Sequence, residues 1–163
     1  MKRESIEAGA NIHGCLVQWE GTGILLTGDS GVGKTICALE ISRRGGAWVA
    51  DDIAVLSRRP DRTLSGRAHE KIRNLVHLRE EGIVDIRSLP SLRIAAETRV
   101  DIVVELTKKL EKVKKKGLTA NRWREIMAVE IPCAHVTVLA DTARTVDTVL
   151  NCVGVFMGGR KGA

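Results

Sequence analysis

The sequence predicts an α/β fold in which a sheet opens with a hairpin and a helix packs on one face of that sheet. Three observations support this fold class: two apolar segments joined by a short turn, a glycine-rich loop that leads into a helical pattern, and β-branched segments later in the chain. The chain has 163 residues, of which 44% are apolar, so it can form a hydrophobic core without disulfides. We therefore expect residues 1–163 to form a single domain.

The first two predicted strands run from Ile12 to Trp19 and from Thr22 to Thr27, and both are rich in aliphatic residues. Glu20 and Gly21 separate them. Because glycine adopts the positive φ angles of short hairpin turns, this dipeptide predicts a tight turn. The pair is therefore expected to form a hairpin whose second strand enters the glycine-rich loop.

A helix is predicted from Lys34 to Arg44. Cys37, Ala38 and Ile41 fall on one of its faces, and Gly45-Gly46 provide a stop signal. This helix is expected to pack on the sheet directly after the loop.

The later elements follow from residue type and spacing. Ala47 to Ala50 reads as a short buried strand, and Arg58 to Gly66 as an exposed loop or hairpin. Arg99 to Leu106 and Cys133 to Leu139 read as two further strands. After Thr142, apolar residues at helical spacing predict a closing amphipathic helix: Val146, Val149, Leu150, Val153 and Met157.

The net charge of +6 is concentrated in the segment Lys108 to Lys116, which holds six lysines in nine residues. No aromatic residues that could stack on bases are interspersed with these lysines, so we expect no nucleic-acid partner. A solvated helix face or loop is the simpler interpretation of the run, and docking of an acidic protein stays open.

The four cysteines, Cys15, Cys37, Cys133 and Cys152, form no CxxC pair and are expected to be buried thiols rather than metal ligands. No segment resembles a secretory signal or a membrane span. We therefore expect a cytoplasmic protein with no membrane partner.

One motif carries the chemistry. Gly28, Asp29, Ser30, Gly31, Val32, Gly33, Lys34 and Thr35 match the P-loop pattern GxxxxGK[ST] in full, between an apolar strand and a helix. In such a loop, backbone N–H groups and the helix N-terminus bind phosphate oxygens. Lys34 adds a positive charge for the β- and γ-phosphates, and the Thr35 hydroxyl can ligate Mg²⁺. The alternative is a glycine turn that binds nothing.

An acidic residue after a neighbouring strand completes this type of site, and Asp51 and Asp52 follow the strand that ends at Ala50. Since successive side chains of an extended segment point in opposite directions, we expect one carboxylate to face Mg²⁺ and the other an attacking hydroxyl. A helix cap or turn acid is the alternative. The motifs do not distinguish ATP from GTP.

Four segments together resemble the C-terminal catalytic domain of bacterial HPr kinase/phosphorylase: Ile12-His13-Gly14, the loop Gly28–Thr35, Ala38-Leu39-Glu40, and Val49-Ala50-Asp51-Asp52. Members of that family phosphorylate a serine of the phosphocarrier HPr with ATP and Mg²⁺, and they can reverse the step with inorganic phosphate. The resemblance implies a core like that of phosphoenolpyruvate carboxykinase and a homo-oligomer, a hexamer in the family. It covers the C-terminal domain, and no counterpart of the family's N-terminal domain is expected.

The resemblance also assigns roles to individual residues. It makes Asp52 the general base toward the serine hydroxyl, and it places Thr35 and Asp51 near Mg²⁺. His13 matches the histidine of the family's His-Gly pair and would lie near the transferred phosphoryl group.

The chain departs from the family at its signature segment, approximately Glu-Ile-Arg-Gly-Leu-Gly-Ile-Ile-Asp-Val. Here the matching stretch is His77-Leu78-Arg79-Glu80-Glu81-Gly82-Ile83-Val84-Asp85-Ile86, in which His77 replaces the acidic residue implicated in Mg²⁺ binding. A later Arg-Pro-Gly-Arg is reduced to Ala140-Asp141-Thr142-Ala143-Arg144. These departures predict a weak phosphorylase reaction.

Three functions fit these observations. The leading one is an ATP-dependent kinase that phosphorylates a protein serine, with an HPr-like protein as its partner. A non-catalytic nucleotide sensor and a small-molecule kinase on the same core are the alternatives. A sensor has little need of two adjacent acids, so Asp51 and Asp52 favour a kinase.

Overall fold

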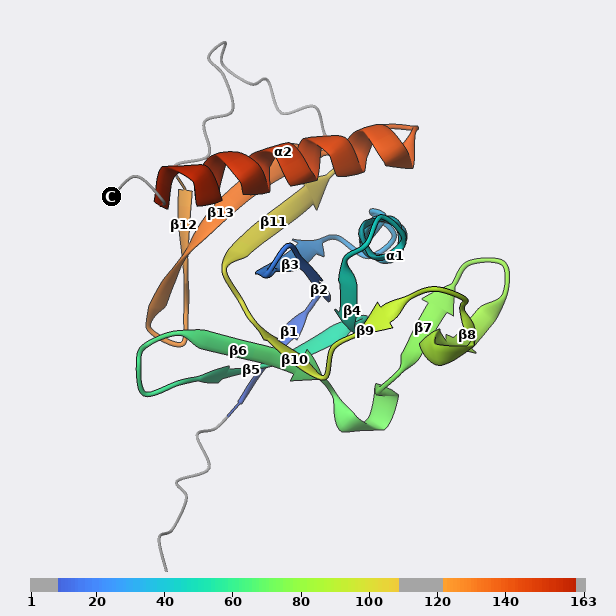
Figure 1. The fold of residues 1–163 in the computed structure, drawn as a ribbon, viewed down its shortest axis with the longest axis horizontal. Coiled ribbons are helices and arrows are strands. Elements are labelled where there is room, and N and C mark those ends of the chain that lie inside the picture. Colours follow the sequence, from blue (N-terminus) through green and yellow to red (C-terminus); the bar gives the residue numbers. More distant parts are fainter. Residues whose placement is uncertain (1–8, 109–121, 161–163) are drawn as a thin grey trace, which may run out of the picture.

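The computed structural model describes residues 9–108 and 122–160, which form three layers (Figure 1). A seven-stranded mixed sheet is the middle layer. Helices α1 (Lys34–Arg43) and α2 (Thr142–Arg160) cover one of its faces, and a four-stranded antiparallel sheet covers the other. The expected α/β fold class is confirmed.

The seven-stranded sheet places β3 at its centre, directly before the P-loop motif Gly28–Thr35, which is called the phosphate loop below. β11 pairs in parallel with both β3 and β13, whereas β2 pairs antiparallel with β3 and β4. The order across the sheet is β12 (Arg122–Ile126), β13 (Val129–Thr137), β11 (Ile102–Thr107), β3 (Thr22–Gly28), β2 (Cys15–Trp19), β4 (Ala47–Ala50) and β9 (Arg93–Ile94).

The smaller elements frame this sheet. The four-stranded sheet has the order β1 (Ala10–His13), β5 (Ile53–Arg58), β6 (Leu64–Ala68) and β10 (Glu97–Arg99). A separate hairpin is formed by β7 (Leu75–Leu78) and β8 (Gly82–Asp85), which lies on the α1 side of the molecule in Figure 1. Two single 3₁₀ turns occupy Glu70–Ile72 and Ile86–Ser88.

Two aliphatic cores hold the layers together, because alternate side chains of the central strands point to opposite faces of the sheet. Leu26, Val104 and Val136 pack against both helices. Leu25, Val103 and Ile131 pack against the four-stranded sheet. The central strands are therefore buried on both faces, and their carboxyl ends are held at fixed positions.

Both predicted helices are confirmed. α1 ends at Arg43, and Cys37, Ala38 and Ile41 are buried as expected. α2 buries Val146, Val149 and Val153, while Leu150 and Met157 are partly buried against the same core.

The hairpin into the phosphate loop is confirmed, with Glu20 and Gly21 both at positive φ in the turn between β2 and β3. The prediction of one strand from Ile12 to Trp19 is wrong. The chain passes from one sheet to the other at Gly14, whose N–H donates to the Asp52 carbonyl at 2.8 Å. This crossing places His13 beside Asp52.

The later strands are confirmed with changed limits. Ala47–Ala50 is a fully buried strand, and the segment from Arg58 to Gly66 is a hairpin whose second strand starts at the buried Leu64. The predicted strand Arg99–Leu106 is interrupted before β11, where the Asp101 carboxylate accepts a hydrogen bond from the Gly23 N–H at 2.9 Å.

The strand predicted from Cys133 to Leu139 starts earlier, at Val129, and ends at Thr137. Its antiparallel partner β12 was not expected. Met127 and Ala128 form the turn between the two strands at positive φ, and neither residue is typical of such a turn.

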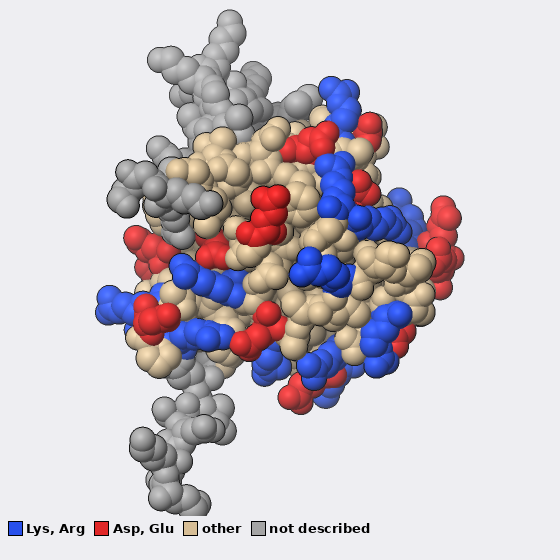
Figure 2. All heavy atoms as spheres, viewed as in Figure 1, with Lys and Arg blue, Asp and Glu red and all other residues tan. Residues whose placement is uncertain are grey.

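The surface and the thiols are unremarkable in themselves. Basic and acidic side chains are interspersed over the face shown in Figure 2. All four cysteines are buried, as expected.

Of the lysine run, only Lys108 lies within the described residues, where it is exposed; Lys109 to Lys116 lie outside them. Neither described helix combines the length and apolar character needed to cross a membrane.

Candidate functional site

The phosphate loop joins the centre of the sheet to the start of α1. Gly28 ends β3 with φ 138°, and a Cβ at this position would clash with the Leu106 carbonyl oxygen of the neighbouring strand. Gly33 has φ 115° and caps α1 without a side-chain hydrogen bond. The loop therefore folds tightly over the ends of β3 and β11 and presents the N-terminus of α1, where backbone N–H groups favour an anion.

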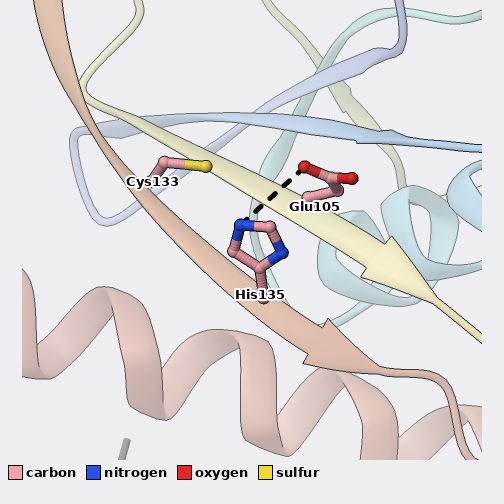
Figure 3. A group of neighbouring side chains, drawn as sticks. All are labelled: Glu105, Cys133 and His135. Carbon is pink, nitrogen blue, oxygen red and sulfur yellow. Dashed lines mark ion pairs between the residues drawn. The ribbon is translucent and has the colours of Figure 1, made fainter. Parts of the chain in front are cut away.

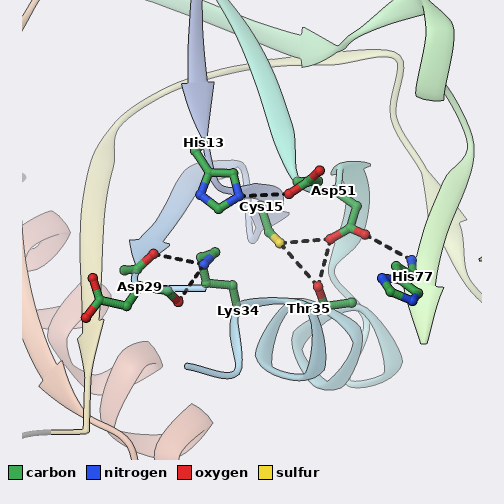
Figure 4. Close-up of polar contacts among 9 residues, drawn as sticks. His13, Cys15, Asp29, Lys34, Thr35, Asp51 and His77 are labelled. Carbon is green, nitrogen blue, oxygen red and sulfur yellow. Dashed lines mark hydrogen bonds and ion pairs between the residues drawn. The ribbon is translucent and has the colours of Figure 1, made fainter. Parts of the chain in front are cut away.

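Lys34 is buried although it is charged. Its Nζ donates to the Gly28 and Asp29 carbonyl oxygens, each at 2.9 Å, so the side chain folds back over the loop (Figure 4). Two carbonyl oxygens only partly compensate a buried ammonium group. An anion bound in the loop would compensate the remaining positive charge of the Lys34 ammonium group.

Asp51 lies at the end of β4 and is only 7% exposed. Its Oδ1 accepts hydrogen bonds from the Thr35 hydroxyl at 2.8 Å and from the Cys15 thiol at 3.1 Å. Its Oδ2 accepts the backbone N–H of His77 at 3.1 Å. These three donors fix the carboxylate beside Thr35, as Figure 4 shows.

The oxygens of Thr35 and Asp51 form a donor set that fits a hard divalent cation such as Mg²⁺. Thr35 belongs to α1 and Asp51 directly follows β4, and both of these elements are anchored in the core. The donor chemistry at this point of the chain is therefore compatible with the expected metal.

Asp52 behaves differently from Asp51. Its φ angle is 61°, in the left-handed region, and its flanking residues close a tight turn in which the Ile53 N–H donates to the Asp51 carbonyl at 2.6 Å. The expectation that Asp51 and Asp52 belong to an extended segment is therefore wrong. The turn directs the Asp52 carboxylate to His13, whose Nε2 lies 2.8 Å from Oδ1.

All these side chains meet in one cleft of about 410 Å³. The side chains of the lining differ in their exposure to solvent. Asp51 is buried, whereas the side chains of His13 and Asp52 are 55% and 63% exposed. The lining residues are His13, Cys15, Ser30, Gly31, Gly33, Lys34, Thr35, Ile36, Asp51, Asp52, His77 and Arg79.

Three of the predicted loop residues do not line the cleft. Val32 is buried in the core below the loop, and Gly28 contributes its carbonyl to Lys34. The Asp29 carboxylate points away from Lys34 in Figure 4, although its carbonyl accepts a hydrogen bond from that residue.

Three lining residues had no predicted role: Cys15, Ile36 and Arg79. Cys15 looked like a small hydrophobic residue in a strand. Its burial, and then the negative charge of Asp51, raise the pKa of its thiol well above the ordinary value, so the thiol stays protonated and serves as a hydrogen-bond donor. Arg79 was part of the signature segment. The family signature begins Glu-Ile-Arg, and this chain has His-Leu-Arg there, so Arg79 is the only one of these three residues that matches. This match could have identified Arg79 as a residue of the site.

Comparisons with known proteins show which family this sequence matches. The family model described as HPr Serine kinase C-terminal domain matches residues 4–157. The HPr kinase/phosphorylase of Caldicellulosiruptor bescii is 37% identical over 123 residues, which cover 74% of this chain and 39% of that protein. The HPr kinase/phosphorylase of Latilactobacillus sakei subsp. sakei is 33% identical over 141 residues, which cover 86% of this chain and 45% of that protein.

A solved structure shows the same fold. The Hpr(Ser) kinase/phosphatase of Coxiella burnetii superposes with a TM-score of 0.82 at 20% identity, covering 94% of this chain and 95% of that chain. The chain spans less than half the length of the two curated relatives described above. The match of the family model over residues 4–157 shows that this chain belongs to the HPr serine kinase C-terminal domain family.

Proposed function

We propose that this chain is an ATP-dependent kinase that transfers the γ-phosphoryl group to a protein serine, with a small HPr-like phosphocarrier protein as its substrate and Mg²⁺ as its cofactor. The observation that carries this proposal is the His13–Asp52 pair, which opens into the same cleft as Lys34, Thr35 and Asp51. The cleft thus combines a phosphate-binding half and a half that can accept a proton.

The phosphate half consists of the loop amides, Lys34 and the two oxygen donors. Lys34 would exchange its contacts to the Gly28 and Asp29 carbonyls for phosphate oxygens. Thr35 and Asp51 would hold Mg²⁺, which neutralises charge on the phosphates when bound. In this arrangement the protein contributes positioning and charge.

The second half of the cleft, called the acceptor half, consists of His13 and Asp52 and carries out the proton transfer. As the serine oxygen forms its bond to phosphorus, the bond to the bridging oxygen of the nucleotide breaks and ADP leaves. The serine hydroxyl proton passes to Asp52, which is exposed enough to contact a protein substrate. His13 orients this carboxylate, and its imidazole can stabilise charge near the transferred group. Arg79 adds positive charge to the cleft lining.

A non-catalytic sensor would not require this second half. Phosphate and metal binding use Lys34, Thr35 and Asp51, whereas Asp52 is turned toward His13 in the exposed part of the same cleft. This arrangement supports catalysis over sensing.

The names of the relatives support HPr as the substrate, since both curated proteins described above are HPr kinase/phosphorylases. The proposal also includes a homo-oligomer, a cytoplasmic location, and no nucleic-acid or membrane partner. We further propose that the phosphate-driven reverse reaction is weak, because His77 replaces an acidic residue and Glu80-Glu81 replace Gly-Leu in the signature segment.

The substrate can be tested by incubating the chain with ATP, Mg²⁺ and either HPr or HPr whose acceptor serine is replaced by alanine, and locating the phosphate by mass spectrometry. Phosphorylation of the serine alone supports the proposal. Failure of HPr together with phosphorylation of small hydroxyl compounds would favour a small-molecule kinase. Parallel reactions with GTP identify the preferred nucleotide.

The reverse reaction needs a separate assay. Serine-phosphorylated HPr is mixed with inorganic phosphate and Mg²⁺, and the release of pyrophosphate is followed. We expect little release, and rapid stoichiometric release would contradict the expected weakness of this reaction.

A further inference from the structure

A second group of potential ligands lies outside the proposed active site. Glu105 of β11 and Cys133 and His135 of β13 present a carboxylate oxygen, a sulfur and an imidazole nitrogen that all lie within 4.8 Å of one another (Figure 3). The Nε2 of His135 and the Oε2 of Glu105 are 3.9 Å apart. None of these three residues has a role in the proposed phosphotransfer.

The parallel register of the two strands brings the group together. Glu105 pairs with His135, and Val103 pairs with Cys133. Because side chains two residues apart on a strand share a face, Cys133 and His135 point to the same side of the sheet as Val103 and Glu105. That side faces away from α1 and α2, since Val103 and Cys133 belong to the core beneath the four-stranded sheet.

The three side chains span the boundary between core and solvent. Cys133 is 4% exposed, whereas the side chains of His135 and Glu105 are 31% and 45% exposed. The sulfur is therefore fixed by packing, and the other two donors can rotate toward it from rigid neighbouring strands. A metal ion could reach the group from solvent without opening the core.

The donor types select the class of metal. Sulfur, imidazole nitrogen and carboxylate oxygen together are ligands for Zn²⁺ and related transition metals, whereas Mg²⁺ requires oxygen ligands. A thiolate and a carboxylate would also supply two negative charges to balance a divalent cation. Three protein ligands leave one position of a tetrahedral ion for water.

We propose that Glu105, Cys133 and His135 form a binding site for a zinc-class divalent metal ion, separate from the Mg²⁺ ligands Thr35 and Asp51. In tetrahedral zinc sites, bonds of about 2.0–2.3 Å place neighbouring donor atoms about 3.5 Å apart. The donors here need to approach by about 1 Å, which rotation of the partly exposed His135 and Glu105 side chains provides. On binding, the Cys133 S–H bond breaks, its proton passes to solvent, and the sulfur lone pair binds the metal.

A buried hydroxyl beside this group is a second, independent observation. Thr27 pairs with Glu105 on the other side of β11, so its side chain lies on the same face of the sheet. Its Oγ1 is buried and has no hydrogen-bond partner among the parts of the chain that the structure describes. Such atoms are rare, and a bound ion or a water molecule nearby can satisfy them.

The experiment is a titration of the full chain, without nucleotide, with Co²⁺ as a spectroscopic substitute for Zn²⁺. The site predicts a thiolate-to-cobalt charge-transfer band in the near ultraviolet, one proton released per metal, and a rise in Tm with added Zn²⁺. Excess Mg²⁺ should not displace the metal. The absence of a thiolate band in the unmodified chain would overturn the proposal.

Variants locate the metal. Cys133→Ser should abolish the thiolate band, and His135→Gln should weaken Co²⁺ binding at least about tenfold, as loss of a ligand does. The Cys15 thiol also lies beside a carboxylate, so Cys15→Val is the necessary comparison and should keep the band. Cys152→Ala, which alters a buried thiol in α2, should keep it too.

These outcomes decide the proposal independently of kinase activity. A band that survives Cys133→Ser, or one that disappears in Cys15→Val, would place the metal elsewhere and refute the site. If circular dichroism shows that Cys133→Ser does not fold, His135→Gln decides the question, because the His135 side chain is partly exposed. Unchanged Co²⁺ affinity in His135→Gln would contradict the proposal.

Discussion

His13 Nε2 lies 2.8 Å from Asp52 Oδ1, and the backbone itself brings the two residues together. His13 is the last residue of β1 and pairs in register with Ile53, the first residue of β5. Asp52 directly precedes that strand, at positive φ. The strand ladder and the turn therefore position the carboxylate and the imidazole before any substrate binds.

Lys34→Ala should lower ATP affinity by about a hundredfold, because it removes a charged donor to the phosphates and hydrogen bonds to charged groups contribute about 1.5–3 kcal/mol. Isothermal titration calorimetry with ATP and with adenosine measures the phosphate-dependent part. Adenosine binding should not change. Lys71→Ala, at an exposed lysine away from the cleft, is the control. Equal ATP affinity in Lys34→Ala and Lys71→Ala would contradict the role of the loop.

His77→Glu should strengthen Mg²⁺-dependent nucleotide binding. The backbone N–H of His77 donates to Asp51, and its side chain lines the cleft, so a carboxylate here adds an oxygen ligand near the metal donors. The measurement is the Mg²⁺ dependence of ATP affinity. His77→Gln, which adds no charge, should resemble the unmodified chain, and a similar gain in both variants would exclude metal ligation as the cause.

The pH dependence of stability should include a contribution from Cys37. Burial, and then the Glu40 carboxylate, raise the pKa of this thiol to about 11 in the folded chain. The unfolded chain releases the same proton at about pH 8.5. Its contribution, about 3 kcal/mol, is therefore complete below about pH 8.5 and is lost as pH rises toward 11.

The matched variant for this prediction is Cys37→Ala, which retains the other thiols. Urea unfolding between pH 7 and pH 10.5 should show a shallower loss of stability in Cys37→Ala than in the unmodified chain. Equal slopes would show that Cys37 ionises alike in both states.

The phosphate half of the site could be predicted from the sequence because it is local. A strand, a glycine-rich loop and a helix follow one another without interruption, and the geometry of Lys34 and Thr35 is set within this segment. The position of Asp51 followed from the short strand before it. For the same reason, the hairpin and both helices were predicted nearly in full.

The acceptor half depends on contacts between distant segments. His13 reaches Asp52 only because the chain changes sheet at Gly14 and turns at Asp52, and periodicity indicates neither feature. The sequence indicates a core residue at Cys15, but its thiol donates a hydrogen bond to the Asp51 carboxylate, which follows the neighbouring strand β4. Likewise, Glu105 and His135 become neighbours only through the parallel pairing of β11 and β13.

Single-turnover phosphotransfer by Asp52→Asn tests the central claim most directly. The amide keeps the shape of the side chain but cannot accept the serine proton, so the rate of HPr phosphorylation should fall by about 10²–10⁴-fold. Mg²⁺-ATP affinity should not change, because Thr35 and Asp51 remain. Asp61→Asn, which alters an exposed carboxylate between β5 and β6, should keep the full rate. Retention of the full rate in Asp52→Asn would contradict the assignment of Asp52 as the base.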